Sequence, residues 1–161
     1  MKIVVLGGAG LMGRIAVKDL AASEGPQQVV IADRDTDLAC QVVELLPRGR
    51  SKVSIVHTDV TDRGKLVDTL RGADSVLNAV HYYFNLEVMR ACVEAGVHYT
   101  DLGGLFHLTR KQLELHDEFA AAGLTAVLCM GSAPGVPNVQ ARYAADRLDT
   151  IDSIRIYDGI L

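Results

Sequence analysis

The first 13 residues constrain the fold of this chain more than any other stretch. An apolar run at residues 2–6 is followed directly by a glycine-rich turn, and a helical pattern begins at Leu11. Gly8, Gly10 and Gly13 form the pattern G-x-G-x-x-G between a strand and a helix. We expect Gly8 to allow the tight turn, Gly10 to let the main chain approach a pyrophosphate, and Gly13 to let the helix pack closely on its strand. The stretch therefore predicts a dinucleotide site, with phosphates at the positive end of the helix.

A carboxylate further along the chain supports this interpretation. Residues 28–32 form a second apolar run, and Asp33 ends it about 20 residues after Gly13. A carboxylate at this point accepts hydrogen bonds from the adenosine ribose hydroxyls and repels a 2′-phosphate, so Asp33 favours NAD. Arg34 follows directly and could instead pair with a 2′-phosphate, which leaves NADP open.

Composition limits the class of protein. With 161 residues the chain is long enough for one domain with a substantial core, and a net charge of -4 without a basic run argues against nucleic acid or anionic membrane as partners. No apolar run approaches the roughly 20 residues of a membrane span, and residues 2–6 do not suggest a cleavable leader. Cys40, Cys92 and Cys129 lie in apolar segments and are expected to be buried thiols of a reducing compartment. We therefore expect a cytoplasmic protein.

Apolar strands alternate with amphipathic helices along the chain. This order predicts the α/β class: a doubly wound parallel sheet of six or seven strands, in the order 3-2-1-4-5-6, with helices on both faces. In the first helix Leu11, Ile15 and Leu20 mark the apolar face. The expected later strands are 53–56, 75–80, 97–101 and 124–129, and the expected later helices include 85–95, 108–122 and 136–147.

The end of the chain has a different pattern. Residues 152–158 alternate polar and apolar side chains, as in a half-buried strand. We expect residues 1–150 to form the cofactor domain and residues 151–161 to begin a second, truncated domain for substrate binding and dimerisation.

Three residues near the carboxyl ends of the central strands are weak candidates for catalysis. His81 could transfer a proton, or could be a loop residue on the rim of the site. Tyr99 and Asp101 could take part in chemistry, with Asp101 binding a substrate ammonium, or could only cap the turn that follows their strand. The other histidines lack the spacing of metal ligands, so no metal site is expected.

Two longer motifs point to a family. The run EAGVHYTDLGG at residues 94–104 and the turn APGVPN at 133–138 are more specific than the glycine pattern, and with them the chain resembles the saccharopine dehydrogenase family over nearly its whole length. The resemblance implies the amino-terminal Rossmann portion of an enzyme that moves hydride between a nicotinamide and a carbon bearing nitrogen. It also implies a second α/β domain that carries most substrate contacts and a homodimer interface. Saccharopine reductases tend to have an aspartate where this chain has Ala133, which favours the branch that resembles lysine dehydrogenase.

The resemblance also implies roles for individual residues. The loop would bind pyrophosphate and Asp33 the ribose, Asp59 and Val60 would flank adenine, and the end of the fourth strand would lie beside the nicotinamide half. His81 stands in a segment that departs from the family pattern, so no catalytic role is transferred to it. The implied loop residues are Gly8, Gly10, Leu11, Met12 and Gly13, and those of the fourth strand are Asn78, Ala79 and Val80.

Two alternatives remain open. An extended short-chain dehydrogenase or epimerase would share the glycine turn, but that class needs a lysine four residues after a tyrosine, and here Arg147 follows Tyr143 at that spacing. A cofactor-binding module without catalysis is the other alternative.

Overall fold

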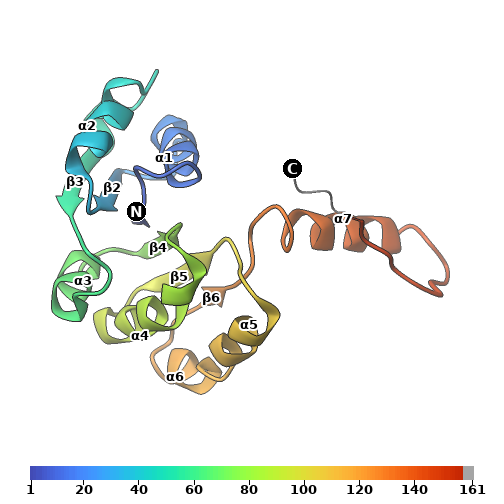
Figure 1. Ribbon diagram of the computed structural model, residues 1–161. Coiled ribbons are helices and arrows are strands. Elements are labelled where there is room, and N and C mark those ends of the chain that lie inside the picture. Colours follow the sequence, from blue (N-terminus) through green and yellow to red (C-terminus); the bar gives the residue numbers. More distant parts are fainter. Residues whose placement is uncertain (158–161) are drawn as a thin grey trace.

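A parallel sheet forms the centre of the computed structural model, which describes residues 1–157. Its six strands are ordered β3-β2-β1-β4-β5-β6, as the sequence predicts, and all neighbours run parallel (Figure 1). The strands are β1 (Lys2–Leu6), β2 (Gln28–Asp33), β3 (Val53–His57), β4 (Ser75–Asn78), β5 (His98–Asp101) and β6 (Ala126–Val127).

Helices cover both faces of the sheet because the central strands are apolar on both sides. The helices are α1 (Gly13–Ala22), α2 (Thr36–Glu44), α3 (Arg63–Leu70), α4 (Asn85–Ala95), α5 (Phe106–Leu113), α6 (His116–Ala121) and α7 (Val136–Ala145), with short 3₁₀ turns η1 (Arg50–Lys52) and η2 (Tyr82–Phe84). On one face, alternate residues of β1 and β2 pack against α1 and α2; on the other, the intervening residues pack against α3, α4 and α6. None of these helices combines the length and hydropathy that crossing a bilayer requires.

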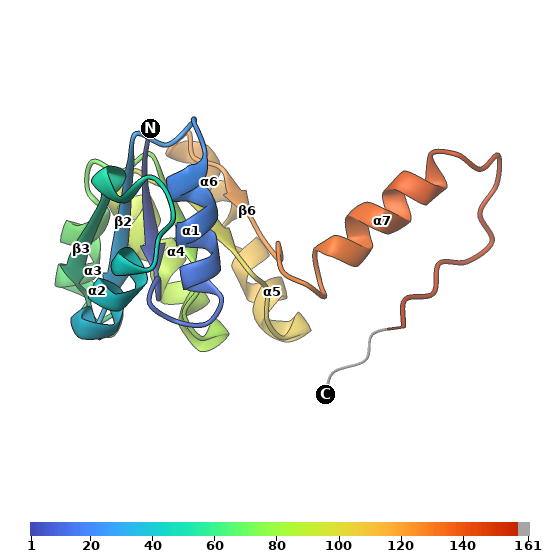
Figure 2. The same ribbon diagram turned by 90° about the horizontal axis from the view of Figure 1, so that it is seen from above.

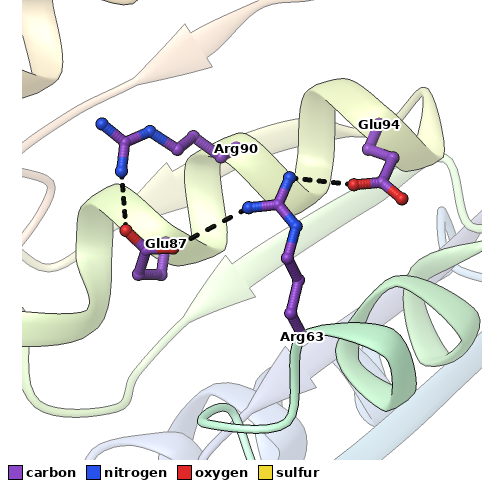
Figure 3. A network of polar contacts seen from close by, with 4 residues as sticks. All are labelled: Arg63, Glu87, Arg90 and Glu94. Carbon is purple, nitrogen blue, oxygen red and sulfur yellow. Dashed lines mark hydrogen bonds and ion pairs between the residues drawn. The ribbon is translucent and has the colours of Figure 1, made fainter.

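An ion-pair network joins α3 to α4 on the outer surface (Figure 3). Arg63 lies 2.9 Å from Glu94 and 3.8 Å from Glu87, and Glu87 also pairs with Arg90 at 2.6 Å. All four side chains are about half exposed, so water screens the pairs and they add little stability. Burial of Leu66, Val67 and Leu70 therefore does more to hold α3 in place.

The first helix buries a different face from the expected one. Val17 and Ala21 are fully covered, whereas Leu11 and Ile15 are 71% and 60% exposed. The close approach of Gly13 to the preceding loop fixes the rotation of α1, and this contact overrides the pattern of larger apolar side chains.

Several predicted elements are shorter in the structure. The helix expected at 108–122 is divided into α5 and α6, because the backbone of Leu115 leaves the helical region with ψ near 7°. Leu115 and Phe119 still face the core, so the apolar spacing gives no sign of the break. The strand expected at 124–129 is reduced to β6, because Cys129 adopts φ 64° and its N–H bonds to the carboxylate of Asp101 instead of a strand. β4 likewise ends at Asn78, before the expected Val80.

The prediction of three buried thiols is wrong for two of them. Cys92 is buried on α4, whereas Cys40 is exposed and Cys129 is intermediate. Cys40 lies on the outer side of α2, because Ala39 and Val42 make the helix's buried contacts.

The last helix does not join the layers around the sheet. α7 has no buried residue and extends away from the domain, and the chain then turns back beside it (Figure 2). Residues 151–157 form no strand in the structure, because no neighbouring strand pairs with them, and residue 158 of the expected strand lies outside the described residues. The prediction of a second domain from residue 151 onward stays a prediction.

Candidate functional site

The loop between β1 and α1 makes a tight turn over residues 7–10. Gly7 has φ 70°, a conformation that favours glycine, and its carbonyl accepts a hydrogen bond of 3.0 Å from the N–H of Gly10. The N–H of Gly7 in turn donates to the carbonyl of Ala32 at 2.9 Å. Gly8 is the second residue of this turn, as predicted, and a Cβ on Gly8 would approach Ile31 and the carbonyl of Val5 at 3.0 Å.

Gly13 is required by close packing. A Cβ atom at this position would overlap the carbonyl oxygen of Gly7 and lie 2.7 Å from the Cα of Gly8. Backbone meets backbone here, so no side chain can move aside. The loop and the first turn of α1 therefore form one rigid unit, as predicted for this glycine.

The amino-terminal end of α1 offers free donors. Across residues 1–157, no hydrogen bond is made by the backbone N–H groups of Leu11, Met12 and Gly13. The positive end of the helix dipole lies at the same point. Three consecutive donors at a helix start are suited to phosphate oxygens, and this arrangement fits the pyrophosphate that the sequence predicts.

Asp33 connects the end of β2 to the glycine loop. Its Oδ2 accepts a hydrogen bond of 3.0 Å from the N–H of Ala9, and its Oδ1 accepts one of 3.1 Å from Asp35. The carboxylate that was expected to meet ribose hydroxyls therefore also holds the loop in shape.

A cavity of about 280 Å³ lies beside this loop, at the carboxyl ends of β1 to β4. This volume is at the small end of ligand pockets and suits one part of a dinucleotide, such as the adenosine. Six predicted site residues line the cavity, together with others that the sequence did not single out. The predicted ones are Asp33, Arg34, Asp59, Val60, Val80 and His81; the additional ones are Gly7, Ala32, Thr58, Thr61 and Phe84.

Asp59 lines this cavity, and hydrogen bonds hold its side chain in position. Its Oδ1 accepts from both the N–H and the hydroxyl of Thr61, at 2.9 and 2.7 Å. These bonds lower the pKa of Asp59, and the nearby charge of Arg34 lowers it further. Asp59 is thus a fixed anion, suited to accepting hydrogen bonds from a ligand.

The end of β4 lies against the glycine loop. A Cβ on Gly7 would come within 3.1 Å of the backbone of Ala79 and of the Val80 side chain. Asn78, in contrast, points into the protein, where it is only 1% exposed. The three residues predicted to run beside the nicotinamide therefore divide into two near the loop and one in the core.

Asn78 belongs to a buried polar network that converges on Asp101. Asp101 Oδ2 accepts from Tyr99 at 2.9 Å, from Gln112 at 2.7 Å and from Asn85 at 3.3 Å. Asn78 donates to Asn85 and to the Tyr99 hydroxyl, at 2.9 and 3.2 Å. Burial, and next the Asp101 charge, raise the pKa of Tyr99, so its hydroxyl stays protonated.

The same carboxylate fixes the chain beyond the sheet. Asp101 Oδ1 accepts from the backbone N–H groups of Gly103 and Cys129, both at 2.8 Å. Both oxygens of Asp101 are thus occupied, and Tyr99 and Asp101 are almost fully buried. Of the three catalytic candidates, only His81 borders the cavity.

His81 begins the turn η2 after β4. Its Nδ1 accepts a 3.4 Å hydrogen bond from the N–H of Tyr83, and its ring lies 4.2 Å from that of Tyr82. The side chain is exposed. Among residues 1–157 no group bonds to the other imidazole nitrogen, Nε2, which can therefore meet a ligand.

A larger cavity of about 610 Å³ lies elsewhere, between α7 and the segment that turns back beside it. Residues of α7 and 151–157 line it, and it contains none of the predicted site residues. Residues 1–157 also contain no group of three or more His, Cys, Asp or Glu side chains that could hold a metal ion.

Comparison with known proteins identifies the sheet domain. Residues 3–127 match the family model described as the saccharopine dehydrogenase NADP binding domain. Among solved structures, apo saccharopine dehydrogenase from Saccharomyces cerevisiae is similar with a TM-score of 0.76 and 23% identity, over 91% of this chain and 31% of that one. The likeness to this solved structure supports the fold alone.

Curated relatives cover nearly the whole chain. A carboxynorspermidine synthase of Vibrio cholerae is 28% identical over 99% of this chain and 44% of its own length. A carboxyaminopropylagmatine dehydrogenase of Synechocystis is 32% identical over 98% of this chain and 42% of its own. A trans-acting enoyl reductase of Mycobacterium leprae is 30% identical over 88% of this chain and 35% of its own length. The chain thus spans less than half the length of these relatives.

Proposed function

Because the chain belongs to the saccharopine dehydrogenase family through its NADP-binding domain, we propose that it is the cofactor-binding part of an oxidoreductase acting on an amino acid or its imine adduct. Bound NAD(P) would supply hydride chemistry at a carbon that bears nitrogen, and the protein would fix the geometry. The names of two relatives, a carboxynorspermidine synthase and a carboxyaminopropylagmatine dehydrogenase, support an amine-containing substrate. The lysine-dehydrogenase-like branch remains the finer proposal for the substrate.

One observation carries the cofactor part of this proposal. The unpaired N–H groups of Leu11, Met12 and Gly13 lie at a helix start, beside a cavity that Asp33 and Asp59 border. In the proposed complex these donors bind the pyrophosphate, and Gly8 and Gly10 leave room for it.

The remaining residues divide between the two halves of the cofactor. Asp33 and Arg34 would bind the ribose of the adenosine, and Asp59 and Val60 would hold the adenine. Ala79 and Val80, which follow β4 beside the loop, would contact the nicotinamide half.

For catalysis, position favours His81 over the other two candidates. His81 borders the cavity with a free imidazole nitrogen, whereas the Tyr99 hydroxyl and the Asp101 carboxylate bond to each other. We assign Tyr99 and Asp101 a positioning role, because their network, with Asn78, joins the ends of β4 and β5 to the segment after β6.

A direct test combines binding with turnover. We expect this chain to bind NADH or NADPH with a change in nicotinamide fluorescence, and the full-length protein that carries it to form reduced cofactor with lysine, saccharopine or related amines. Failure to bind either cofactor would refute the site. Binding without turnover by the full-length protein, across a panel of basic and branched amino acids, would favour a module without catalysis.

A second function is supported by the enoyl reductase relative, which is 30% identical over 146 residues. Hydride would then be added to a carbon–carbon double bond. An assay that follows oxidation of reduced cofactor with an α,β-unsaturated thioester, in parallel with the amine panel, distinguishes the two functions.

A further inference from the structure

A third cavity, of about 260 Å³, lies between α4, α5, α6 and β6, on the face of the sheet that α4 covers. The residues that line it include the buried Met89, Gln112 and Phe119 and the exposed Ala120 and Thr125. The cavity thus reaches from the surface into the core. It shares no lining residue with the cavity beside the glycine loop.

Gln112 is the buried residue of α5, and only one end of its side-chain amide is bonded. Its Nε2 donates to Asp101 Oδ2 at 2.7 Å and lies 3.3 Å from the sulfur of Met89. Because an ionised carboxylate can only accept, the bond to Asp101 fixes which end of the amide is the nitrogen. The oxygen, Oε1, is therefore the end turned away from Asp101, and no group within residues 1–157 donates a hydrogen bond to it.

A buried acceptor without a partner is rare. Most buried side-chain polar atoms have one, because a group that is removed from water and left unpaired destabilises the fold. Among residues 1–157, Oε1 of Gln112 is the one buried side-chain nitrogen or oxygen in this state. A bound molecule that donates an O–H or N–H group would pair it, so the cavity that Gln112 lines is suited to a ligand with one donor.

The rest of the lining restricts the ligand further. Among the described residues, no Asp, Glu, Lys or Arg side chain lines the cavity, so a charged group in it would lose its hydration without gaining an ionic partner. The ring of Phe119 and the sulfur of Met89 favour an aromatic group. The volume of about 260 Å³ is small for a ligand pocket and suits a single ring.

We propose that this cavity binds a small, neutral, one-ring aromatic molecule whose hydroxyl donates to Oε1 of Gln112. The site is separate from the cofactor site and does not depend on the proposed function. A hydrogen bond to Oε1 polarises the amide and strengthens the bond from its Nε2 to Asp101. Asp101 also accepts from the backbone N–H groups of Gly103 and Cys129, so occupation of the cavity changes the surroundings of these two groups.

Phenol and toluene separate the hydrogen bond from the burial of a ring, because they have nearly the same size and only phenol can donate. Titration of the chain with each compound, followed by NMR of the backbone amides, measures both affinities. We expect phenol to bind about fivefold more tightly than toluene. At equal occupancy, phenol should also shift the amide signals of Gly103 and Cys129 more than toluene does. Gln112→Met keeps an apolar chain of similar length without the amide, and it should bring the two affinities within about twofold of each other.

A second pair of variants leaves the bond between Gln112 and Asp101 intact. Ala120→Leu adds a larger side chain to the lining and should weaken phenol binding at least about tenfold. Ala121→Leu makes the same change at an exposed neighbour on α6, outside the cavity, and should leave the affinity within about twofold. Equal affinities for phenol and toluene in the unmodified chain, or equal phenol affinities in the two leucine variants, would overturn the proposal.

Discussion

The carboxylate of Asp33 accepts a 3.0 Å hydrogen bond from the backbone N–H of Ala9, in the middle of the glycine loop. Two elements that are separate in sequence are thereby joined: the acid at the end of β2 and the turn after β1. The same carboxylate also accepts from Asp35, at the start of α2. Asp33 therefore holds the loop in shape, in addition to its proposed role at the ribose.

Asp33→Ala should lower the free energy of unfolding by about 1–3 kcal/mol, because it leaves the Ala9 donor without its charged acceptor. It should also weaken the binding of 5′-AMP. Urea denaturation and calorimetry measure the two effects. Asp37→Ala is the control, since Asp37 is exposed on α2; a loss of the same size there would show that the Ala9 bond is not responsible.

Gly13→Ala should destabilise the chain by about 3 kcal/mol and abolish nucleotide binding, because the added methyl would overlap the backbone of Gly7 and displace the loop. Thermal unfolding measures the loss of stability, and cofactor fluorescence measures the loss of nucleotide binding. Gly25→Ala adds the same methyl where no atom lies within 4 Å, and it should be nearly neutral. Equal behaviour of the two variants would contradict the close packing of α1 on the loop.

Tyr99→Phe should cost about 1–3 kcal/mol of unfolding free energy, because it removes a buried donor to Asp101 and an acceptor for Asn78. Tyr143→Phe, at a 63% exposed position on α7, should change stability by less than about 0.5 kcal/mol. If Tyr99 only positions the strand ends, the pH profile of turnover keeps its shape in Tyr99→Phe. A shifted profile would instead indicate that Tyr99 itself titrates in the reaction.

The buried thiol of Cys92 should make stability fall at alkaline pH. Burial raises the pKa of Cys92 from 9.0 to about 12, so above pH 9 the unfolded chain loses a proton that the folded chain keeps. Between pH 9 and 12 this residue contributes a loss of at most about 1.4 kcal/mol per pH unit. Stability curves at several pH values, compared with those of Cys92→Ala, isolate the effect from that of Tyr99, whose raised pKa acts in the same direction.

Thiol labelling checks the same feature at neutral pH. Cys40 is exposed and should react with a thiol reagent in the native protein, whereas Cys92 should react only after unfolding. Cys40→Ala should remove the fast-reacting thiol. Rapid native labelling of Cys92 would contradict its burial.

Local patterns in the sequence were enough for the framework of the fold and for much of the candidate site. Glycines, apolar runs and an acid at the right spacing predicted the parallel sheet and its strand order, because these features act through short-range sterics and the handed connection of strands. Asp33 was predicted from its spacing, whereas Asp59 and Val60 were predicted from the family resemblance. They meet at one cavity with Val80 because the carboxyl ends of parallel strands share an edge.

Contacts between distant segments decided the rest, and no local pattern encodes them. Long-range packing rotated Val17 inward and left α7 away from the sheet. It also occupied both oxygens of Asp101. Hydrogen bonding and charge compensation depend on which groups the folded chain brings within about 3 Å, and only the tertiary structure sets those distances.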